Sequence, residues 1–464
     1  MLTTTDPKVG GTTVESKPVT EAVNAAPPVM TNYRWVMVAL GFLIIIINYM
    51  DRTAMSYAIS PICKEFHLTN SQFGFIMAAF PVGYAIMTTG GGIIVDLWGA
   101  RKVWAASAIA WSSVTAVLGL CNGMWMFFVF RAFLGLTEGP CFPALTRLVT
   151  DWLPTSERAK STAIGLAAVP LASAVGGPII ASLIISIGWK AMFFVLGSLG
   201  IAWAVVWYYM YRDYPENSKH VSPAELAFIR EGQPTHAGKS DEEIRRHHLD
   251  TGSTTWKFIL TNPSLLSNNY AFFAFGYLLF FASNWLPGYL EQTYHVELKH
   301  VGWFMAVTWM PAAILLPAAG FLSDWLLKRT GKMRIARSHL IWTCQLACAI
   351  CFYGVTLVHS LPISVTLIAL GLGIGLAPNA AFYALNSDLA KDRAGTSLGL
   401  MDSFFAVAGI MALALTGYLS DKSGDFNLPI LLLVGFTLTS VVGILLFQHP
   451  DRDLEVRGGS FSNG

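Results

Sequence analysis

Charged residues are scarce in this sequence. Asp, Glu, Lys and Arg make up 12% of its 464 residues, about half the share that is usual in soluble domains. The formal net charge is only +2, which gives no reason to expect a nucleic-acid partner. The low charge content excludes an ordinary soluble domain.

The zinc-hydrolase motif His-Glu-x-x-His is absent as well. The 10 histidines of the chain fall in loops or at the ends of apolar runs. Chemistry inside a membrane would need a nucleophile with its base, or metal ligands, within such a run. Cys344, Cys348 and Cys351 share one helix face, but small residues of this kind also pack between membrane helices. We therefore predict neither an enzyme nor a metal or cofactor site.

Long apolar runs occupy most of the chain, which is 54% hydrophobic. Each run has about 20 residues, enough for a helix to cross roughly 30 Å of hydrocarbon, and is too continuous for the alternating strands of a membrane barrel. We predict an all-α membrane protein with twelve transmembrane helices, at residues 35–59, 72–95, 102–121, 124–150, 161–187, 190–210, 264–290, 301–326, 338–358, 361–389, 396–420 and 428–447.

One long polar segment, between Tyr211 and Trp256, separates six of these runs from the other six. We therefore expect two six-helix bundles, at 33–211 and 258–448, joined by a cytoplasmic linker loop at 212–257 in which Ser222 caps a short helix. Residues 1–32 lack the basic start and apolar core of a secretory signal, so we expect a disordered cytoplasmic tail there and a second tail at 449–464. Lys and Arg concentrate on the side of both tails, which favours cytoplasmic termini.

The two halves repeat each other. Gly92 and Asp96, after the second predicted helix, are matched by Gly320 and Asp324 after the eighth. TDWLPTSERAKSTAIGL after the fourth is echoed by SDLAKDRAGTSLGL after the tenth. Repeated halves around a midplane site are typical of secondary transporters. Charge pairs at the ends of the predicted helices would latch such halves during alternating access, and we predict this gating role for Asp96, Arg101, Arg147 and Asp324.

Four charged residues fall inside the predicted spans: Asp51, Arg52, Arg131 and Glu138. Each costs roughly 2.5–3.5 kcal/mol at mid-membrane, so they should face one another or a wet cavity. Arg131 and Glu138 are seven positions apart and project within about 20° of the same helix face. Gly135 and Gly139 on the same helix would let a partner helix approach closely. The alternative is a static ion network that only holds the helices together.

Three motifs resemble the major facilitator superfamily and, within it, the anion:cation symporter family. They are NYMDR at 48–52, the Asp-x-x-Gly-x-Arg-Lys loop from Asp96 to Lys102, and RAFLGLTEGPCFP at 131–143. The resemblance covers about residues 33 to 448. It implies a monomeric importer in the inner cell membrane that moves a small organic anion together with protons by alternating access and needs no cofactor. The anion would be a monocarboxylate such as a sugar acid or an aromatic acid.

The resemblance also implies roles for individual residues. Arg52 would anchor the substrate carboxylate, Asp51 and Glu138 would carry protons, and Arg131 would respond to their protonation. The remaining implied substrate contacts are Tyr49 and Tyr84 in the first half and Asn284, Trp285, Asn379 and Phe382 in the second.

Asp402 departs from the family pattern, since sugar-acid transporters usually carry Asn at this place in the eleventh helix. Here it would bind a hydroxyl or cationic group of the substrate or carry a further proton. Alternatively, it lies near a helix end and reaches water or a helix N-terminus. A symporter of a zwitterion, an anion exchanger, a uniporter and an exporter therefore stay open beside the symporter of an organic anion.

Overall fold

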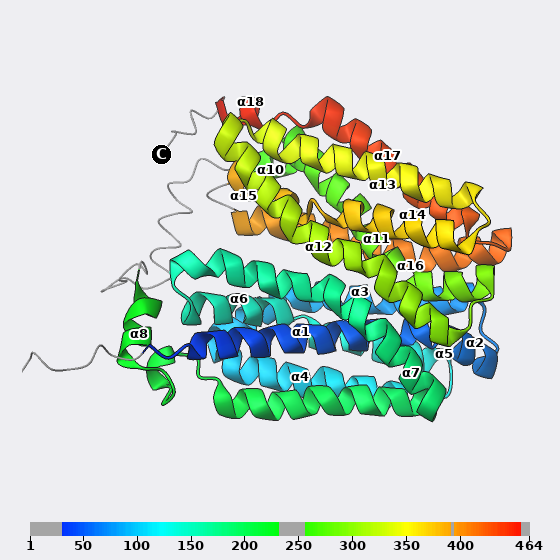
Figure 1. The fold of residues 1–464 in the computed structure, drawn as a ribbon, viewed down its shortest axis with the longest axis horizontal. Helices are drawn as coiled ribbons and strands as arrows, with labels where there is room; N and C mark the ends of the chain where they lie inside the picture. The colour runs from blue at the N-terminus through cyan, green and yellow to red at the C-terminus, as the bar shows by residue number, and fades with distance from the viewer. Residues whose placement is uncertain (1–29, 232–255, 391–393, 456–464) are drawn as a thin grey trace, which may run out of the picture.

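The structure is a computed structural model that describes residues 30–231, 256–390 and 394–455. These residues form helices and no strands (Figure 1). The helices are α1 (Tyr33–Tyr57), α2 (Ile59–Phe66), α3 (Asn70–Trp98), α4 (Ala100–Leu118), α5 (Met124–Glu138), α6 (Cys141–Trp152), α7 (Thr155–Met210), α8 (Pro223–Arg230), α10 (Trp256–Thr261), α11 (Pro263–Tyr294), α12 (Leu298–Thr330), α13 (His339–Leu357), α14 (Leu361–Leu376), α15 (Asn379–Leu389), α16 (Ala394–Ser423), α17 (Asn427–Phe447) and α18 (Pro450–Glu455).

The predicted twelve transmembrane helices are confirmed. Nine helical stretches of the described chain are long and apolar enough to cross a membrane. One of them, at 164–210, counts as two because α7 kinks at Gly188, whose φ of 84° suits a residue without a side chain. The other two are the 19-residue α4 and the pair formed by α5 and α6.

Two predicted spans are each divided into two helices. The span predicted at 124–150 is α5 and α6, with Pro140 between them, and the span predicted at 361–389 is α14 and α15, with Pro378 between them. A proline lacks the N–H of a helical hydrogen bond and its ring crowds the preceding turn. Both breaks therefore have a local cause that the hydropathy pattern does not reveal.

The polar segments agree only in part with expectation. The short linker helix is confirmed as α8, with Ser222 Oγ accepting from the backbone N–H of Glu225 at 3.2 Å. The tail predicted from residue 449 begins with a helix, α18. Some of these predictions fall outside the described residues: residues 1–29 of the tail predicted at 1–32, residues 232–255 of the predicted linker loop, residues 391–393 of the second repeat segment and residues 456–464 of the second tail.

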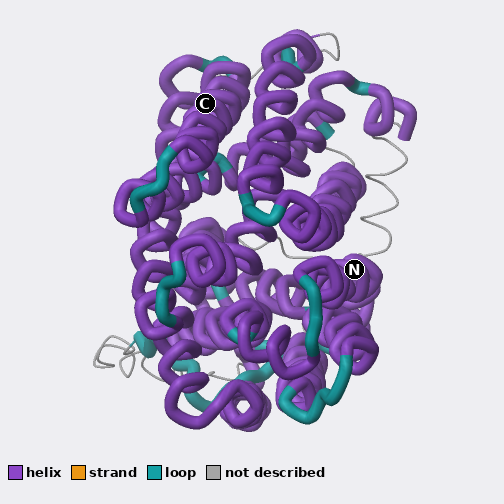
Figure 2. Tube along the Cα trace, turned by 90° about the vertical axis from the view of Figure 1, so that its right-hand side faces the viewer, coloured by secondary structure: helices purple, strands orange, loops and turns teal. Residues whose placement is uncertain are grey.

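The helices form two halves that lie one above the other in Figure 1, with α1 to α7 below and α11 to α17 above. Figure 2 shows the same two groups end on. The halves meet where α3 contacts α16 and where α7 contacts α12. These contacts are close: a Cβ on Gly74 would lie 2.5 Å from the Leu413 carbonyl oxygen, and one on Gly177 would lie 2.9 Å from that of Gly302.

The two ends of the bundle differ. We call the end at which α1 begins and α17 ends the terminal end, on the left in Figure 1, and the opposite end the distal end. Hydrogen bonds join the halves at the distal end. Asp421 accepts from the backbone N–H groups of Asn70 and Ser71 at 3.1 and 2.6 Å, the side chains of Asn70 and Gln292 exchange hydrogen bonds, and Ser60 donates to Glu291. The distal end is therefore closed.

Candidate functional site

Arg52 and Glu138 form a buried ion pair in the N-terminal half. Arg52 lies on α1, and Glu138 is the last residue of α5. Arg52 donates to Glu138 Oε2 from Nη2 at 2.8 Å and from Nε at 3.1 Å. The Glu138 side chain has no accessible surface, and that of Arg52 keeps 8%. Each charge offsets the burial of the other, since removing one partner would leave an uncompensated charge.

Arg131 joins this pair from the same helix as Glu138. Its Nη1 donates to the main-chain carbonyl of Arg52 at 3.2 Å, and its side chain is fully buried. Helix α5 lies close to α3 because Gly135 has no side chain; a Cβ there would lie 2.1 Å from the Phe80 carbonyl oxygen. The predicted close approach of a partner helix at Gly135 is therefore confirmed.

Aromatic rings surround the Arg52 guanidinium. Its Cζ lies 4.5 Å from the ring centre of Tyr49, 4.6 Å from that of Phe80 and 5.0 Å from that of Tyr84. Cation–π contacts of this kind hold a planar guanidinium by its faces and leave its N–H edges for a carboxylate. Among the described residues, Arg52 Nη1 has no hydrogen-bond partner. The arrangement suits the binding of an anion.

Asp51 does not share the surroundings of Arg52. Its side chain is fully buried, and neither carboxyl oxygen makes a hydrogen bond within the described chain. Neighbouring residues of a helix point about 100° apart, and Asp51 faces the indole N–H of Trp111 on α4. Of the four predicted charges, the structure thus brings Arg52, Arg131 and Glu138 into contact and places Asp51 beside them without a partner.

Asp402 lies on the C-terminal half, on α16, beside Tyr383 of α15. Tyr383 Oη donates to Asp402 Oδ1 at 3.3 Å, and Tyr383 keeps 36% of its surface accessible. Both residues are within electrostatic range of Tyr84, and Tyr383 also of Tyr49. Asp402 therefore faces the rings around Arg52 from the opposite half.

The other residues of the C-terminal half that were predicted to contact the substrate lie in helix contacts within the bundle or at the start of α15. Trp285 is fully buried, donates to the Leu413 carbonyl at 3.3 Å and meets the ring of Phe73, which places it in the contact of α11 with α3 and α16. Asn284 is buried and donates to the carbonyl of Phe280, four residues earlier on the same helix. Asn379, half-buried, begins α15, and Phe382 packs inside the C-terminal half against the ring of Phe272.

The predicted gating residues pair within their own halves in this structure. Arg147 lies 3.8 Å from Asp96 and 2.8 Å from Asp151, and Arg337 lies 2.9 Å from Asp324. The backbone N–H of Arg101 donates to Asp213, and its guanidinium donates to the Tyr208 carbonyl. These pairs all lie at the terminal end, where Asp96 and Asp324 keep 72% and 65% of their side chains accessible.

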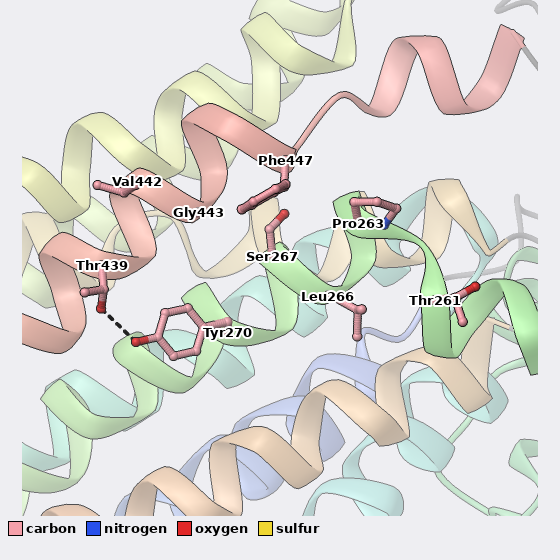
Figure 3. A pocket seen from close by; sticks show the side chains of 9 residues that line it. All are labelled: Thr261, Pro263, Leu266, Ser267, Tyr270, Thr439, Val442, Gly443 and Phe447. Atoms are coloured by element: carbon pink, nitrogen blue, oxygen red, sulfur yellow. Dashed lines mark hydrogen bonds between the residues drawn. The ribbon is translucent and has the colours of Figure 1, made fainter.

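An apolar pocket of about 530 Å³ lies between α11 and α17 (Figure 3). Tyr270 and Thr439 share a hydrogen bond of 2.7 Å at one end of it. Its lining consists of Thr261, Pro263, Leu266, Ser267, Tyr270, Thr439, Val442, Gly443 and Phe447. None of these side chains carries a charge, so the pocket offers no ion pair to an anion.

Sequence reasoning missed three side chains of the site. Phe80 covers both Arg52 and Arg131, Tyr383 binds Asp402, and Trp111 faces Asp51. The available signals were weak: Tyr383 directly follows the predicted Phe382, and Trp111 lies in the middle of a predicted span.

A bundle of twelve membrane helices in two halves, with a buried ion pair inside the N-terminal half, is the architecture of a membrane transporter. Residues 41–413 match the model of the Major Facilitator Superfamily, and the chain belongs to this family. The predicted resemblance and fold class are confirmed, and the family consists of transporters, not enzymes.

Several relatives match along most of their length. A hexuronate transporter of Bacillus subtilis is 28% identical over 88% of this chain and 93% of its own. A probable sulfoacetate transporter of Cupriavidus necator is 30% identical over 86% and 90%. The fold is similar to the inward-facing, unoccupied structure of a bacterial homolog of the human lysosomal transporter Spinster, with a TM-score of 0.75, 17% identity, and coverage of 91% of this chain and 98% of that one.

Proposed function

We propose that the protein is a secondary transporter that carries a small organic monocarboxylate together with protons. The observation that carries this proposal is the buried pair of Arg52 and Glu138, in which an acid occupies the N–H edges of a guanidinium that suits a carboxylate. The names of the relatives, which include hexuronate, sulfoacetate and L-galactonate transporters, support an organic anion as the substrate.

The coupling follows from competition for Arg52. A substrate carboxylate that binds the Arg52 fork displaces Glu138 from it. The displaced Glu138 is buried, and an ionised carboxylate without a partner is costly there, so it takes up a proton. When the substrate leaves, Glu138 gives up its proton and returns to Arg52. Binding of the anion and binding of the proton therefore promote each other.

The orientation is part of the proposal. With both termini in the cytoplasm, as the Lys and Arg distribution favours, the closed distal end faces outward and the terminal end faces inward. The structure would then be the state that releases substrate inside. We further propose that the protein works as a monomer in the inner cell membrane, with the predicted halves at 33–211 and 258–448 rocking against each other.

The test is proton entry into dye-loaded proteoliposomes on addition of sugar acids, aromatic acids, dicarboxylates and amino acids in turn. A symporter gives a saturable proton signal with one class of acid. Arg52→Ala abolishes binding of that acid, whereas Glu138→Gln keeps exchange across the membrane but loses accumulation driven by the proton gradient. Because Arg52→Ala leaves Glu138 buried and unpaired, the double variant Arg52→Ala with Glu138→Gln serves as the folded control without an anion site.

Concentrative uptake at the normal rate by both single variants would exclude this mechanism. Exchange without any proton signal in the wild type would instead favour an anion exchanger or a uniporter.

A zwitterionic substrate is the second candidate. It is favoured by Asp402 and Tyr383, which face the Arg52 site from the other half. Arg52 would hold the carboxylate and Asp402 the cationic group, so the best ligand in the panel would be an amino acid.

A further inference from the structure

Helix α3 of the N-terminal half begins against an acid of the C-terminal half. Asp421 lies near the end of α16. Its two carboxylate oxygens accept from the first backbone N–H groups of α3, those of Asn70 at 3.1 Å and Ser71 at 2.6 Å. A carboxylate in this position binds N–H groups that have no partner within the helix and meets the positive end of the helix dipole. Asp421 therefore completes the start of a helix that belongs to the other half.

Helix α3 also has a cap of its own. The Thr69 side chain accepts from the backbone N–H of Gln72 at 3.2 Å, and the Gln72 side chain accepts from the backbone N–H of Thr69 at 3.0 Å, which forms a capping box. This cap lies within the N-terminal half and remains when the halves separate. The hydrogen bonds to Asp421 are lost on separation, because donor and acceptor lie on different halves. Asp421 thus stabilises the closed distal end and is not required for α3 to form.

Glycines bring the two helices together next to Asp421. A Cβ on Gly417, one turn before Asp421 on α16, would lie 2.2 Å from the Asn70 carbonyl oxygen. A Cβ on Gly74 of α3 would lie 2.5 Å from the Leu413 carbonyl oxygen. The main chains of α3 and α16 are therefore in direct contact at the distal end, and separating them there breaks both hydrogen bonds to Asp421.

The same two helices carry residues of the charged site. Phe80 and Tyr84 of α3 lie against Arg52, and Asp402 lies on α16. We propose that Asp421 is a positioning residue for the transport cycle: its carboxylate latches the start of α3 to α16 and so sets how often the distal end opens. On opening, water replaces the carboxylate at the two N–H groups, and no covalent bond changes. This inference rests on the proposed rocking of the halves, and not on the identity of the substrate or on proton coupling.

Asp425 provides a matched control for Asp421. It lies four residues later in the chain and, like Asp421, is exposed. It accepts from the backbone N–H of Asn427, the first residue of α17, at 3.0 Å, and from the side chain of Asn427 at 2.9 Å. Both residues belong to the C-terminal half. Asp425→Asn therefore removes a charge at a helix start without disturbing a contact between the halves.

The experiment measures the distance between spin labels on the two halves by pulsed electron paramagnetic resonance, with the full-length protein in lipid nanodiscs. The labels replace Lys64 of α2 and Lys299 of α12, both exposed at the distal end, in a chain whose six native cysteines are replaced by alanine or serine. Asp421→Asn should raise the ratio of open to closed distal ends by about fivefold, less than for a buried charge because water screens Asp421. Asp425→Asn should leave the ratio unchanged.

The donor side of the latch can be removed separately. Asn70 is the first residue of α3 and follows an extended Thr69, a position that suits proline. Asn70→Pro lacks the N–H that binds Asp421, whereas Asn70→Ala keeps it, and both lose the side-chain bonds to Gln292. The open-to-closed ratio should be about twofold higher in Asn70→Pro than in Asn70→Ala, since one of two bonds is removed, and this difference should vanish in an Asp421→Ala background.

Salt supplies a second readout that a merely structural role would not change. Because salt screens exposed charges, raising the ionic strength should raise the open-to-closed ratio of the wild type and have little effect on that of Asp421→Asn.

An unchanged distance ratio in Asp421→Asn, or an equal rise in Asp425→Asn, would overturn the latch. Failure of the proposed symport would show itself differently, as absence of proton entry with the wild-type protein, while the distance ratio would still report on Asp421.

Discussion

Asp51 and Arg52 are adjacent in the sequence, but the structure gives them different neighbours. Arg52 lies among Tyr49, Phe80 and Tyr84 with Glu138 at its N–H edge, whereas Asp51 faces Trp111. The helical turn of about 100° per residue explains the separation. Two adjacent charged residues can therefore have separate roles, one binding the anion and the other holding a proton.

Asp402 offers a test at the same scale. Replacing it by Asn keeps the size of the side chain and its acceptor for Tyr383 but removes the negative charge. If the substrate is zwitterionic, Asp402→Asn should weaken binding by about tenfold or more, as expected for the loss of a charge-assisted hydrogen bond. If the substrate is a plain acid, binding should hold or tighten, because a negative charge near the anion is removed.

Calorimetric or fluorescence titration with the best amino acid and the best plain acid measures the affinities of the wild type and of Asp402→Asn. Tyr383→Phe is the companion variant, since it removes the hydrogen bond and leaves the charge. Equal affinities of the wild type and Asp402→Asn for every ligand would show that Asp402 takes no part in substrate recognition.

The sequence predicts which charged residues lie within the membrane, because hydropathy locates the spans and a charge inside the bilayer has a high free-energy cost. It does not predict their partners. Glu138 reaches Arg52 because α5 ends there, and Tyr383 rather than Phe382 meets Asp402 because α15 begins after the break at Pro378. Partners of this kind depend on where helices begin and how they rotate, and composition does not carry that information.

Helix α5 positions two of the three charges in contact, and its distance from α3 depends on Gly135. Replacing Gly135 by Ala would bring a Cβ to 2.1 Å from the Phe80 carbonyl, a main-chain atom that cannot move alone. We expect a loss of about 1–3 kcal/mol of stability, typical of overpacking, and slower transport because Arg131 and Glu138 shift relative to Arg52. Thermal unfolding in detergent and uptake in proteoliposomes measure the two effects.

Gly435→Ala is the control for this element, since a Cβ on Gly435 of α17 meets nothing within 4 Å. Alanine favours a helix over glycine by about 1 kcal/mol, so this variant should be as stable as the wild type or more so. A Gly135→Ala protein with wild-type stability and uptake would show that α5 and α3 separate without consequence.

The sequence predicts the overall fold more completely than it predicts the contacts of individual helices. The twelve spans and the repeat of Gly92 and Asp96 at Gly320 and Asp324 predicted two related halves, and the structure contains them. The closed distal end was not predictable, because the groups that seal it are ordinary polar residues of loops and helix ends. An example is Asp421 near the end of α16, which accepts hydrogen bonds from the first backbone N–H groups of α3.

Movement of the halves can be tested at that distal end. Ser60 of the N-terminal half donates a hydrogen bond to Glu291 of the C-terminal half. The test is a cross-link between cysteines placed at these two positions, with the nearby Cys63 replaced by Ser. If alternating access opens this end, the cross-link should lower the rate of uptake more than tenfold, and its reduction should restore the rate. The control cross-link joins cysteines at Glu65 and Lys190, an ion pair of 2.5 Å within the N-terminal half. It spans no moving interface and should leave uptake intact. Full uptake by the Ser60 and Glu291 cross-link would mean that the halves stay together at the distal end, and transport would then require a path other than their separation.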